Sequence, residues 1–284
     1  MPPADWHCRA HRFRFPGRAL VVGILNVTPD SFSDGGTALG PEAAIARGLA
    51  LAADGADLID IGGESTRPGS HPVPAAEQLR RIAPVVEALA RRTTVPLSVD
   101  TTRAEVAAEG LRLGASVVND ISGLRDDPDM PGLVATTGAG VIVMHMQGTP
   151  ATMQADPTYA DVVAEVDAFF AERIRELHAA GVRPEQIALD PGIGFGKTPA
   201  QNLTLLAGLA RFQHHGRPVC LGVSRKGFLG HVTGRPVAER GAGSLAVASF
   251  ALGQGAAHIL RVHDVAMTRD AVLLDEAIDA HRRR

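Results

Sequence analysis

The chain has few cysteines and no excess of charge of one sign, and each shortage excludes a class of protein. Its two cysteines, Cys8 and Cys220, lie far apart, which fits neither a disulfide framework nor a cysteine metal cluster. The 28 Lys and Arg residues against 31 Asp and Glu residues give a net charge of −3. This balance predicts no nucleic-acid partner, because it creates no global basic field. An anionic ligand must therefore be bound by a local site.

Long hydrophobic runs are also scarce. Residues 1–18 contain four arginines with no apolar stretch behind them, so no secretory signal is predicted. Residues 241–260 carry no formal charge and are long enough to cross a bilayer. Their Ser244, Gln254 and His258 favour a buried helix followed by a strand instead. We therefore expect a cytoplasmic protein without a membrane partner.

Several signatures of metal and nucleotide sites are missing as well. The chain has no HExxH, no CxxC pair and no G-x-S-x-G motif. The glycine-rich residues 190–198 lack the spacing of a phosphate-binding Walker loop, and no dinucleotide fingerprint follows a strand. Among the scattered histidines, His214, His215 and His281 are expected on the solvated surface, and His145 is expected in the interior.

Short apolar runs rich in Val, Ile and Leu recur along all 284 residues and alternate with stretches of helical spacing. The expected strands are residues 20–25, 58–61, 97–99, 117–118, 141–144, 187–189, 219–222 and 259–262. The expected helices include residues 42–53, 75–90, 104–113, 159–180 and 241–252. Glycines suited to left-handed helix ends follow several helices, at positions 55, 114, 138 and 181. The rhythm predicts a parallel α/β fold.

A (β/α)8 barrel and a doubly wound open sheet share this rhythm, and periodicity alone does not separate them. The strand ends do, because nearly every one is polar. They are Asn26, Asp60, Asp100, Asn119, His145, Asp190, Ser224 with Lys226, and Arg261 with His263. Polar ends that meet at one mouth are typical of a barrel, whereas an open sheet gathers ligand groups at one switch point. We predict a single-domain (β/α)8 TIM barrel over residues 19–284, preceded by an N-terminal extension over residues 1–18.

Two polar loops follow the first two expected strands. Residues 26–36 form a longer loop than a simple βα turn requires, which favours a ligand or lid loop over a capped turn. Residues 62–70 place Arg67 beside hydroxyl groups and after paired glycines. For this second loop, an anion grip and a flexible connector are equally good interpretations.

Three short polar residues, Asp100, Asn119 and Asp190, end apolar strands from which they would point into a dry pocket. A flat heterocycle with an amino group beside a ring N–H would satisfy two such acceptors. Each residue could instead cap the following helix. The cations Lys226 and Arg261 follow the last two strands, whose loops often bind phosphate in barrels. Together these residues predict a pocket for a flat, anion-bearing ligand.

These residues resemble the conserved blocks of the dihydropteroate synthases, a family of pterin-binding barrels. The matching blocks are residues 23–36, 60–69, 98–100, 119–123, 144–149, 190–195, 224–230 and 261–264. They run from about Ala19 to the C-terminal helix. The resemblance implies that the chain joins 7,8-dihydropterin-6-ylmethyl diphosphate to p-aminobenzoate, which gives 7,8-dihydropteroate and diphosphate for folate synthesis.

The resemblance also implies the role of individual residues. The pterin would be bound by Asp100, Asn119, Met144, Asp190 and Lys226. The diphosphate would be bound by Asn26, Thr66, Arg67, Arg261 and His263, and Asn26 would also contact Mg²⁺, the implied cofactor. The p-aminobenzoate pocket would be lined by Phe32, Pro68 and Phe195. The catalytic residues would be Asp100, Lys226 and Asp34, of which Asp34 belongs to a mobile loop of the family.

Two further properties follow from the resemblance, and two other functions share part of the pattern. A homodimer formed by helices late in the chain is implied, and Gly227 departs from the bulkier residue common in the family. A pterin-dependent methyltransferase would need the same polar floor but neither the 26–36 loop nor the cations Arg67, Arg261 and His263. A non-catalytic pterin-binding paralogue would be expected to have lost the loop residues, which are present here.

Overall fold

The computed structural model describes residues 5–15, 17–28, 33–34, 37–38 and 40–282, without the side chains of 33–34 and 37–38. Its centre is a sheet of eight parallel strands in the order β10-β9-β8-β7-β6-β3-β12-β11. Their bounds are β3 (Leu20–Asn26), β6 (Leu58–Gly62), β7 (Leu97–Asp100), β8 (Val117–Asp120), β9 (Gly140–Met144), β10 (Ile187–Asp190), β11 (Cys220–Leu221) and β12 (Ile259–Val262). A parallel bridge between Leu189 and Val219 joins the two outer strands. The predicted barrel is confirmed.

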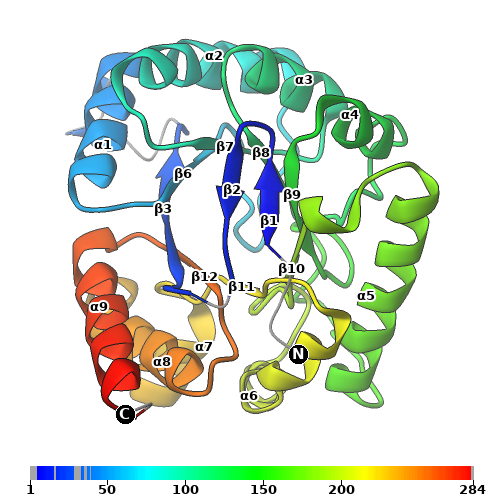
Figure 1. Cartoon of the computed structure of the whole chain (residues 1–284), viewed down its shortest axis with the longest axis vertical. Coiled ribbons are helices and arrows are strands. Elements are labelled where there is room, and N and C mark those ends of the chain that lie inside the picture. Colours follow the sequence, from blue (N-terminus) through cyan, green and yellow to red (C-terminus); the bar gives the residue numbers. More distant parts are fainter. Residues whose placement is uncertain (1–4, 16, 29–32, 35–36, 39, 283–284) are drawn as a thin grey trace.

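Helices surround this barrel, as Figure 1 shows in a view along it. The α-helices are α1 (Pro41–Ala53), α2 (Ala75–Arg92), α3 (Ala104–Arg112), α4 (Met130–Thr137), α5 (Val162–Ala179), α6 (Pro199–Ala207), α7 (Gly227–Thr233), α8 (Gly241–Gly253) and α9 (Val265–Arg282). Short 3-10 helices add η2 (Pro184–Gln186), η3 (Leu209–His215) and η4 (Val237–Glu239). The chain thus alternates strand and helix around the ring, as the apolar rhythm predicts.

Side chains along each strand alternate between two separate cores. Ile59, Val118 and Leu189 point outward and pack in the large core between the strands and the helices. Leu58 and Val117 belong to a second, smaller core inside the barrel. The alternation follows from the two-residue repeat of a strand, and it places the residue two positions after each interior residue one layer higher in the barrel.

An N-terminal hairpin covers the end of the barrel at which the strands begin. Its strands are β1 (Trp6–Cys8) and β2 (His11–Phe13), which pair antiparallel and lie across the middle of Figure 1. Trp6 and Cys8 are fully buried against the interior core, and the Trp6 indole donates to the carbonyl of Gln186 at 2.8 Å. At Gly140 a β-carbon would lie 2.2 Å from the Cys8 sulfur, so only glycine fits there. The hairpin therefore closes this end.

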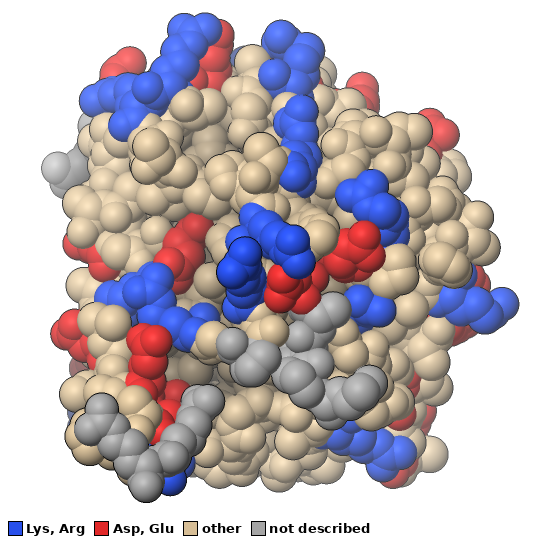
Figure 2. Space-filling view, viewed as in Figure 1, with Lys and Arg blue, Asp and Glu red and all other residues tan. Residues whose placement is uncertain are grey.

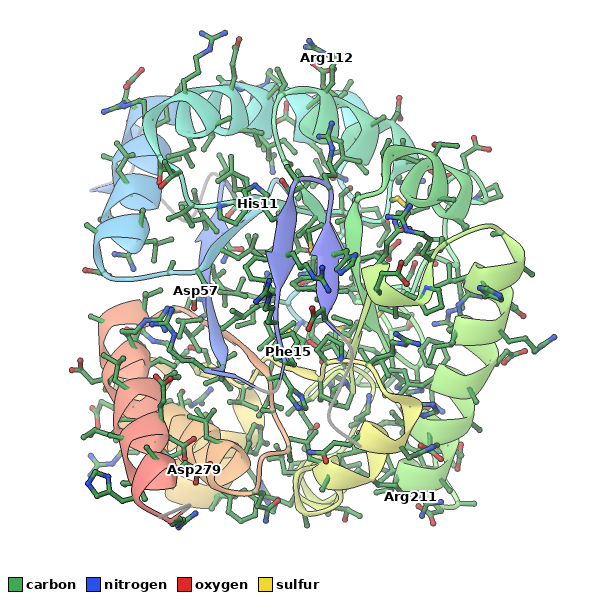
Figure 3. All side chains as sticks on the ribbon, in the orientation of Figure 1. His11, Phe15, Asp57, Arg112, Arg211 and Asp279 are labelled. Atoms are coloured by element: carbon green, nitrogen blue, oxygen red, sulfur yellow. The ribbon has the colours of Figure 1, made fainter. Side chains whose placement is uncertain are left out.

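Polar and charged side chains lie around the hairpin on the same face. Figure 3 places His11 and Phe15 near the middle of this end and Arg112 at its rim. Phe15 packs edge-on against His258, with ring centroids 5.6 Å apart. Positive and negative side chains are interspersed over the face seen in Figure 2. This end of the molecule thus combines an apolar interior with a surface of mixed charge.

The helix and strand ends follow local signals. The glycines at positions 55, 114, 138 and 181 all have positive φ, as their places after helices predict. Helix α5 begins at Val162, three residues later than expected, because the Asp161 carboxylate accepts from the N–H groups of Val163 and Ala164. Residues 241–260 form α8 and the first part of β12, and no helix in the described part of the chain is long and apolar enough to cross a membrane.

Candidate active site

The opposite end of the barrel, where the strands finish, contains a polar pocket. It is lined by Thr66, Asp100, Asn119, Ile121, Met144, Asp190, Phe195, Gly222, Lys226 and Arg261. Half of these are the residues two positions beyond the interior core residues of their strands. Asn119 follows Val117 in this way, and Asp190 follows Ala188. The sequence therefore makes the upper layer of the barrel polar and the lower layer apolar.

Arg261 connects three strands across the floor of this pocket. Its Nε donates to Oδ2 of Asp60 and its Nη2 donates to Oδ2 of Asp100, both at 2.7 Å. Asn119 donates its side-chain amide to the same oxygen of Asp60 at 2.9 Å. Asp60 is fully buried, and its Oδ1 has no hydrogen-bond partner. The floor is thus a network of buried charges that satisfies most, but not all, of its polar atoms.

Burial changes the acidity of the carboxyl groups in this network. It raises the pKa of Asp100 to about 7, because Asp60 and Asp120 add to the effect of burial and Arg261 opposes it. Burial also raises the pKa of Asp120 to about 7, although the N–H and hydroxyl of Ser122 bond to its carboxylate. A carboxyl group that titrates near neutral pH inside a pocket is typical of a functional site.

Asp190 and Lys226 form the opposite wall of the pocket. Oδ1 of Asp190 accepts from the N–H of Gly192 at 2.7 Å, and burial raises the pKa of Asp190 while Lys226 lowers it. Burial lowers the pKa of Lys226 to about 8. The Lys226 ammonium donates to the carbonyl of Ile193 and lies 4.6 Å from the ring centre of Phe195. The wall therefore offers a carboxylate, an ammonium and an aromatic ring to one ligand.

A second buried lysine stands behind this wall. The Lys197 side chain is 1 % exposed, and its ammonium donates to the carbonyls of Gly192 at 3.0 Å and Phe195 at 2.9 Å. It also lies 3.0 Å from Nδ1 of His145. Burial lowers the pKa of Lys197 to about 7 and that of His145 to about 3. A β-carbon at Gly192 would lie 1.8 Å from the His145 carbonyl oxygen, so the loop requires glycine there. These contacts fix the loop that carries Phe195.

Further cations and hydroxyls lie at the rim. Nδ1 of His263 lies 3.0 Å from the hydroxyl of Ser224, and burial lowers the pKa of His263 to about 4. Asp264, the next residue, pairs with Arg225, whose Nη2 is 2.7 Å from its Oδ1. Arg67 is exposed and close enough to His263 to lower its pKa further. The rim thus combines a half-buried imidazole whose protonated form is disfavoured with an exposed guanidinium.

The structure brings most of the predicted site residues to one mouth. Asp100, Asn119, Met144, Asp190, Phe195, Lys226, Arg261 and Thr66 line the pocket itself. Asn26 ends β3 and is paired in register with Gly62 of β6. Pro68 is exposed in the loop after β6. Phe32 lies outside the described residues, and the Asp34 side chain is also not described, although Asp34 belongs to strand β4 (Ser33–Asp34).

The alternative that Asp100 and Asp190 cap the helices that follow them is not supported. Helix α3 begins after Arg103 without a side-chain cap from Asp100, and the N–H of Ala104 is bound by Asp127 instead. The cap of α6 is Thr198 and not Asp190. The carboxylates of Asp100 and Asp190 therefore belong to the pocket, as the sequence pattern indicates.

Two residues of the site were not predicted from the sequence as ligand or support groups. Asp60 was recognised only as a polar strand end, yet it anchors Arg261; its position two residues after the interior Leu58 is the signal that marks it. Lys197 stands in a glycine-rich loop where a lysine is usually solvated. Its burial has no signal in the sequence, because it depends on the approach of His145 from another strand.

Comparison with known proteins agrees with this geometry. The model of the pterin binding enzyme family matches residues 22–263. The dihydropteroate synthase of Escherichia coli is 49% identical over 257 residues, which is 90% of each chain. The dihydropteroate synthase of Xanthomonas albilineans with 4-aminobenzoic acid superimposes with a TM-score of 0.91 at 47% identity, covering 98% of this chain and 99% of that one. The same enzyme in complex with 7,8-dihydropteroate gives 0.88 at 45% identity, covering 97% and 99%. The chain belongs to the dihydropteroate synthases of the pterin-binding enzyme family.

Proposed function

We propose that this protein condenses 7,8-dihydropterin-6-ylmethyl diphosphate with p-aminobenzoate, which forms 7,8-dihydropteroate and releases diphosphate. The observation that carries the proposal is the mouth of the barrel, where Asp100, Asn119 and Asp190 line one pocket with Lys226 and Arg261. Hydrogen-bond acceptors for a flat ring and cations for an anionic leaving group meet there. The 4-aminobenzoic acid and 7,8-dihydropteroate named for the Xanthomonas enzyme are chemically the second substrate and the product of this reaction.

The pterin is assigned to the floor because its edge complements the side chains there. Carboxylates of Asp100 and Asp190 accept from ring N–H and amino groups, and the Asn119 amide both donates and accepts. Lys226 donates to the ring from the opposite side, and Met144, which is almost fully buried, packs on its face. The cost of burying two carboxylates, which Arg261 and the Gly192 N–H already offset in part, is offset further when the ligand donates to them.

The diphosphate is assigned to the rim and the adjoining floor, to Asn26, Arg261 and His263 at the ends of β3 and β12 and to Thr66 and Arg67 in the loop after β6. Arg261 donates to carboxylates through Nε and Nη2, and its Nη1 is assigned to the anion. Because Arg67 is exposed, the diphosphate loses little of its hydration when it pairs with this guanidinium. Hydrogen bonds between guanidinium and phosphate oxygen are stronger than those between neutral groups.

Mg²⁺ fits the donor chemistry of this rim. Asn26 supplies one half-buried amide oxygen next to Gly62, where no side chain intrudes from β6. A single protein oxygen is compatible with Mg²⁺, since that ion usually keeps several waters and takes its other ligands from substrate phosphates. When bound, Mg²⁺ would neutralise negative charge on the diphosphate oxygens.

The chemical step needs positioning and charge stabilisation more than a strong base. The C–O bond to diphosphate breaks with carbocation character at the methylene while the neutral aniline nitrogen forms the new C–N bond. The nitrogen then loses its proton to solvent. Asp100 stabilises the electron-poor pterin, and the cations stabilise the departing anion. Phe195 is held beside Lys226 and forms one wall for the aromatic substrate. Pro68 and Phe32, the latter outside the described residues, are assigned to its other walls, and Asp34 of β4 is assigned a catalytic role.

The assembly and location proposed for the enzyme are those of a cytoplasmic homodimer. Apolar side chains are exposed on the late helices, with Leu274 at 64 %, Ile278 at 55 % and Phe250 at 49 % exposure. Helices α8 and α9, which carry them, pack against one another. Exposed apolar side chains on two adjoining helices support an interface, since association would remove them from water.

The proposed reaction is tested by measuring dihydropteroate and diphosphate from the pterin diphosphate, with Mg²⁺, with and without p-aminobenzoate. We expect product only when all three components are present. A folded protein that binds pterin without product formation would support a non-catalytic paralogue. Transfer of a methyl group from methyltetrahydrofolate to a corrinoid protein would support the methyltransferase instead, and either result would overturn the proposal.

A further inference from the structure

Outside the barrel mouth, two histidines and one carboxylate converge on the surface between α5 and η3. Nε2 of His214 lies 2.7 Å and Nε2 of His215 lies 3.0 Å from Oδ1 of Asp167. One ligand atom from each residue can be chosen so that all three atoms lie within 4.8 Å of one another. Within the part of the chain that the structure describes, this is the one group of three or more His, Cys, Asp or Glu side chains with such spacing.

We propose that Asp167, His214 and His215 form a peripheral site for a divalent transition metal ion, of which Zn²⁺ is the model case. Imidazole and carboxylate are ligands that Zn²⁺ prefers, whereas Mg²⁺ prefers oxygen ligands alone. Ligands of a tetrahedral Zn²⁺ ion lie roughly 3.4 Å apart. The two Nε2–Oδ1 distances, 2.7 and 3.0 Å, need to widen by roughly 0.4–0.7 Å to reach that spacing.

The surroundings make the site partly preorganised and still accessible. The His215 side chain is 7 % exposed and stands edge-on to Phe170, with ring centroids 6.0 Å apart, so its orientation is restrained by packing. The His214 side chain is 57 % exposed, which leaves an open side for the ion and its water ligands. Asp167 is 18 % exposed and comes from the facing helix α5. The packed imidazole of His215, the exposed imidazole of His214 and the Asp167 carboxylate together supply three metal ligands.

Binding requires a change in protonation at Nε2. An Nε2 that donates to the Asp167 carboxylate carries its proton on the atom that would have to bind the metal. That proton must leave Nε2 before the nitrogen can coordinate. The guanidinium of Arg211, whose Nε lies 3.8 Å from Oδ2 of Asp167, would repel a bound cation. Figure 3 labels Arg211 at the outer rim of the molecule, away from the hairpin at its centre.

A bound ion would link segments that are distant in sequence. Asp167 and His214 are separated by 47 residues and belong to α5 and to the segment that precedes β11. An ion that binds only when both are in place stabilises the folded state by mass action. The consequence to measure is therefore metal-dependent thermal stability, which is independent of the reaction at the mouth.

The test is calorimetric titration of the full chain with ZnCl₂ in excess Mg²⁺, together with thermal unfolding. We expect the wild type to bind one Zn²⁺ ion. His214→Ala and Asp167→Asn should each raise the Kd for Zn²⁺ at least about tenfold. His178→Ala, which removes an exposed histidine of the same helix α5, should leave binding unchanged. Arg211→Ala should tighten binding, because it removes the opposing charge.

Thermal unfolding gives the second readout. Zn²⁺ should raise Tm of the wild type and of His178→Ala but not that of His214→Ala. Because His214 is exposed, its substitution is not expected to prevent folding. The proposal is overturned if the wild type does not bind Zn²⁺. It is equally overturned if His214→Ala and Asp167→Asn bind Zn²⁺ with the wild-type Kd and stoichiometry.

Discussion

The two ends of the barrel are built from the same strands but from opposite chemistry. At the end where the strands begin, the interior is filled by apolar residues that include Leu58 and Val117, closed by Trp6 of the hairpin. Two residues further along these strands stand Asp60 and Asn119, which belong to the polar floor of the mouth. Along one strand, the interior residue stabilises the fold and the residue two positions later belongs to the polar site.

Burial of side chains contributes to the free energy of folding with opposite signs at the two ends. Burial of an aliphatic or aromatic side chain at the closed end contributes about 1.5–3 kcal/mol each. Burial of Asp100 at the mouth raises its pKa to about 7, which means that its ionised form is less favourable in the folded protein. Pairing between the charges at the mouth lowers the free-energy cost of burying them. Apolar burial at the closed end offsets the cost that remains.

The largest effect is expected where pairing at the mouth also carries stability. Arg261→Met leaves the fully buried Asp60 without its cation, so we expect a loss of about 3–5 kcal/mol in the free energy of unfolding. Urea unfolding measures this loss. The double variant Asp60→Asn with Arg261→Met should recover part of the stability, because Asp60 is then neutral and only Asp100 has lost its cation. No recovery would contradict the pairing explanation.

At the closed end, Trp6→Ala should cost about 3–5 kcal/mol of stability through loss of a large buried side chain. Its kcat/KM at a temperature where the variant is folded should stay within about twofold of the wild type. Denaturant unfolding and steady-state kinetics on the same preparation measure both quantities. A large fall in kcat/KM of the folded variant would show that the two ends are not separate.

Asp100→Asn should show the reverse pattern. Removing the carboxylate that stabilises electron-poor pterin should lower kcat/KM by about 100- to 1,000-fold. Its Tm should not fall, because a buried group that is costly to ionise has been replaced by a neutral one of the same shape. Steady-state kinetics and thermal unfolding test the pair of expectations, and full kcat/KM would remove Asp100 from its assigned role.

The same residue predicts a pH dependence. Because the pKa of Asp100 is raised to about 7, the carboxyl becomes protonated and uncharged as pH falls through that value. We expect kcat/KM to decrease below about pH 7, and to decrease above about pH 8 as Lys226 loses its proton. The acid limb should be missing from the Asp100→Asn profile. A pH profile of that variant with an unchanged acid limb would assign the limb to another group.

The smallest effect is expected at the exposed rim. Arg67→Ala should weaken the binding of pterin diphosphate roughly tenfold, about 1.4 kcal/mol, without change in Tm. Binding of a pterin that lacks phosphate should be unaffected. Calorimetry with both ligands measures the difference. Equal weakening of both would place Arg67 on the ring and not on the anion.

Much of this comparison could be predicted from the sequence. The apolar runs gave the strand positions to within two residues, because parallel strands buried on both faces read as continuous Val, Ile and Leu. The polar residues that end those runs, such as Asp190, predicted the mouth because the carboxyl ends of barrel strands meet there. The resemblance to a known family then supplied the substrate, which spacing alone does not.

Other features depend on approach in space. The hairpin of Trp6 and Cys8 had no signal in the sequence, because its burial depends on a glycine, Gly140, more than a hundred residues away. The pairing of Arg261 with Asp60 joins residues 201 positions apart. Sequence patterns show which groups a strand ends with, but not which of them neutralise one another.

The most direct test of the pterin floor is equilibrium binding of a 6-hydroxymethyl pterin without phosphate to Asp190→Asn and to the wild type. Asp190 lines the pocket, and its replacement leaves the ring with one carboxylate acceptor, Asp100, instead of two. We expect Kd to rise at least about 100-fold, with Tm unchanged or higher. An unchanged Kd would contradict the assignment of the pterin to the mouth of the barrel.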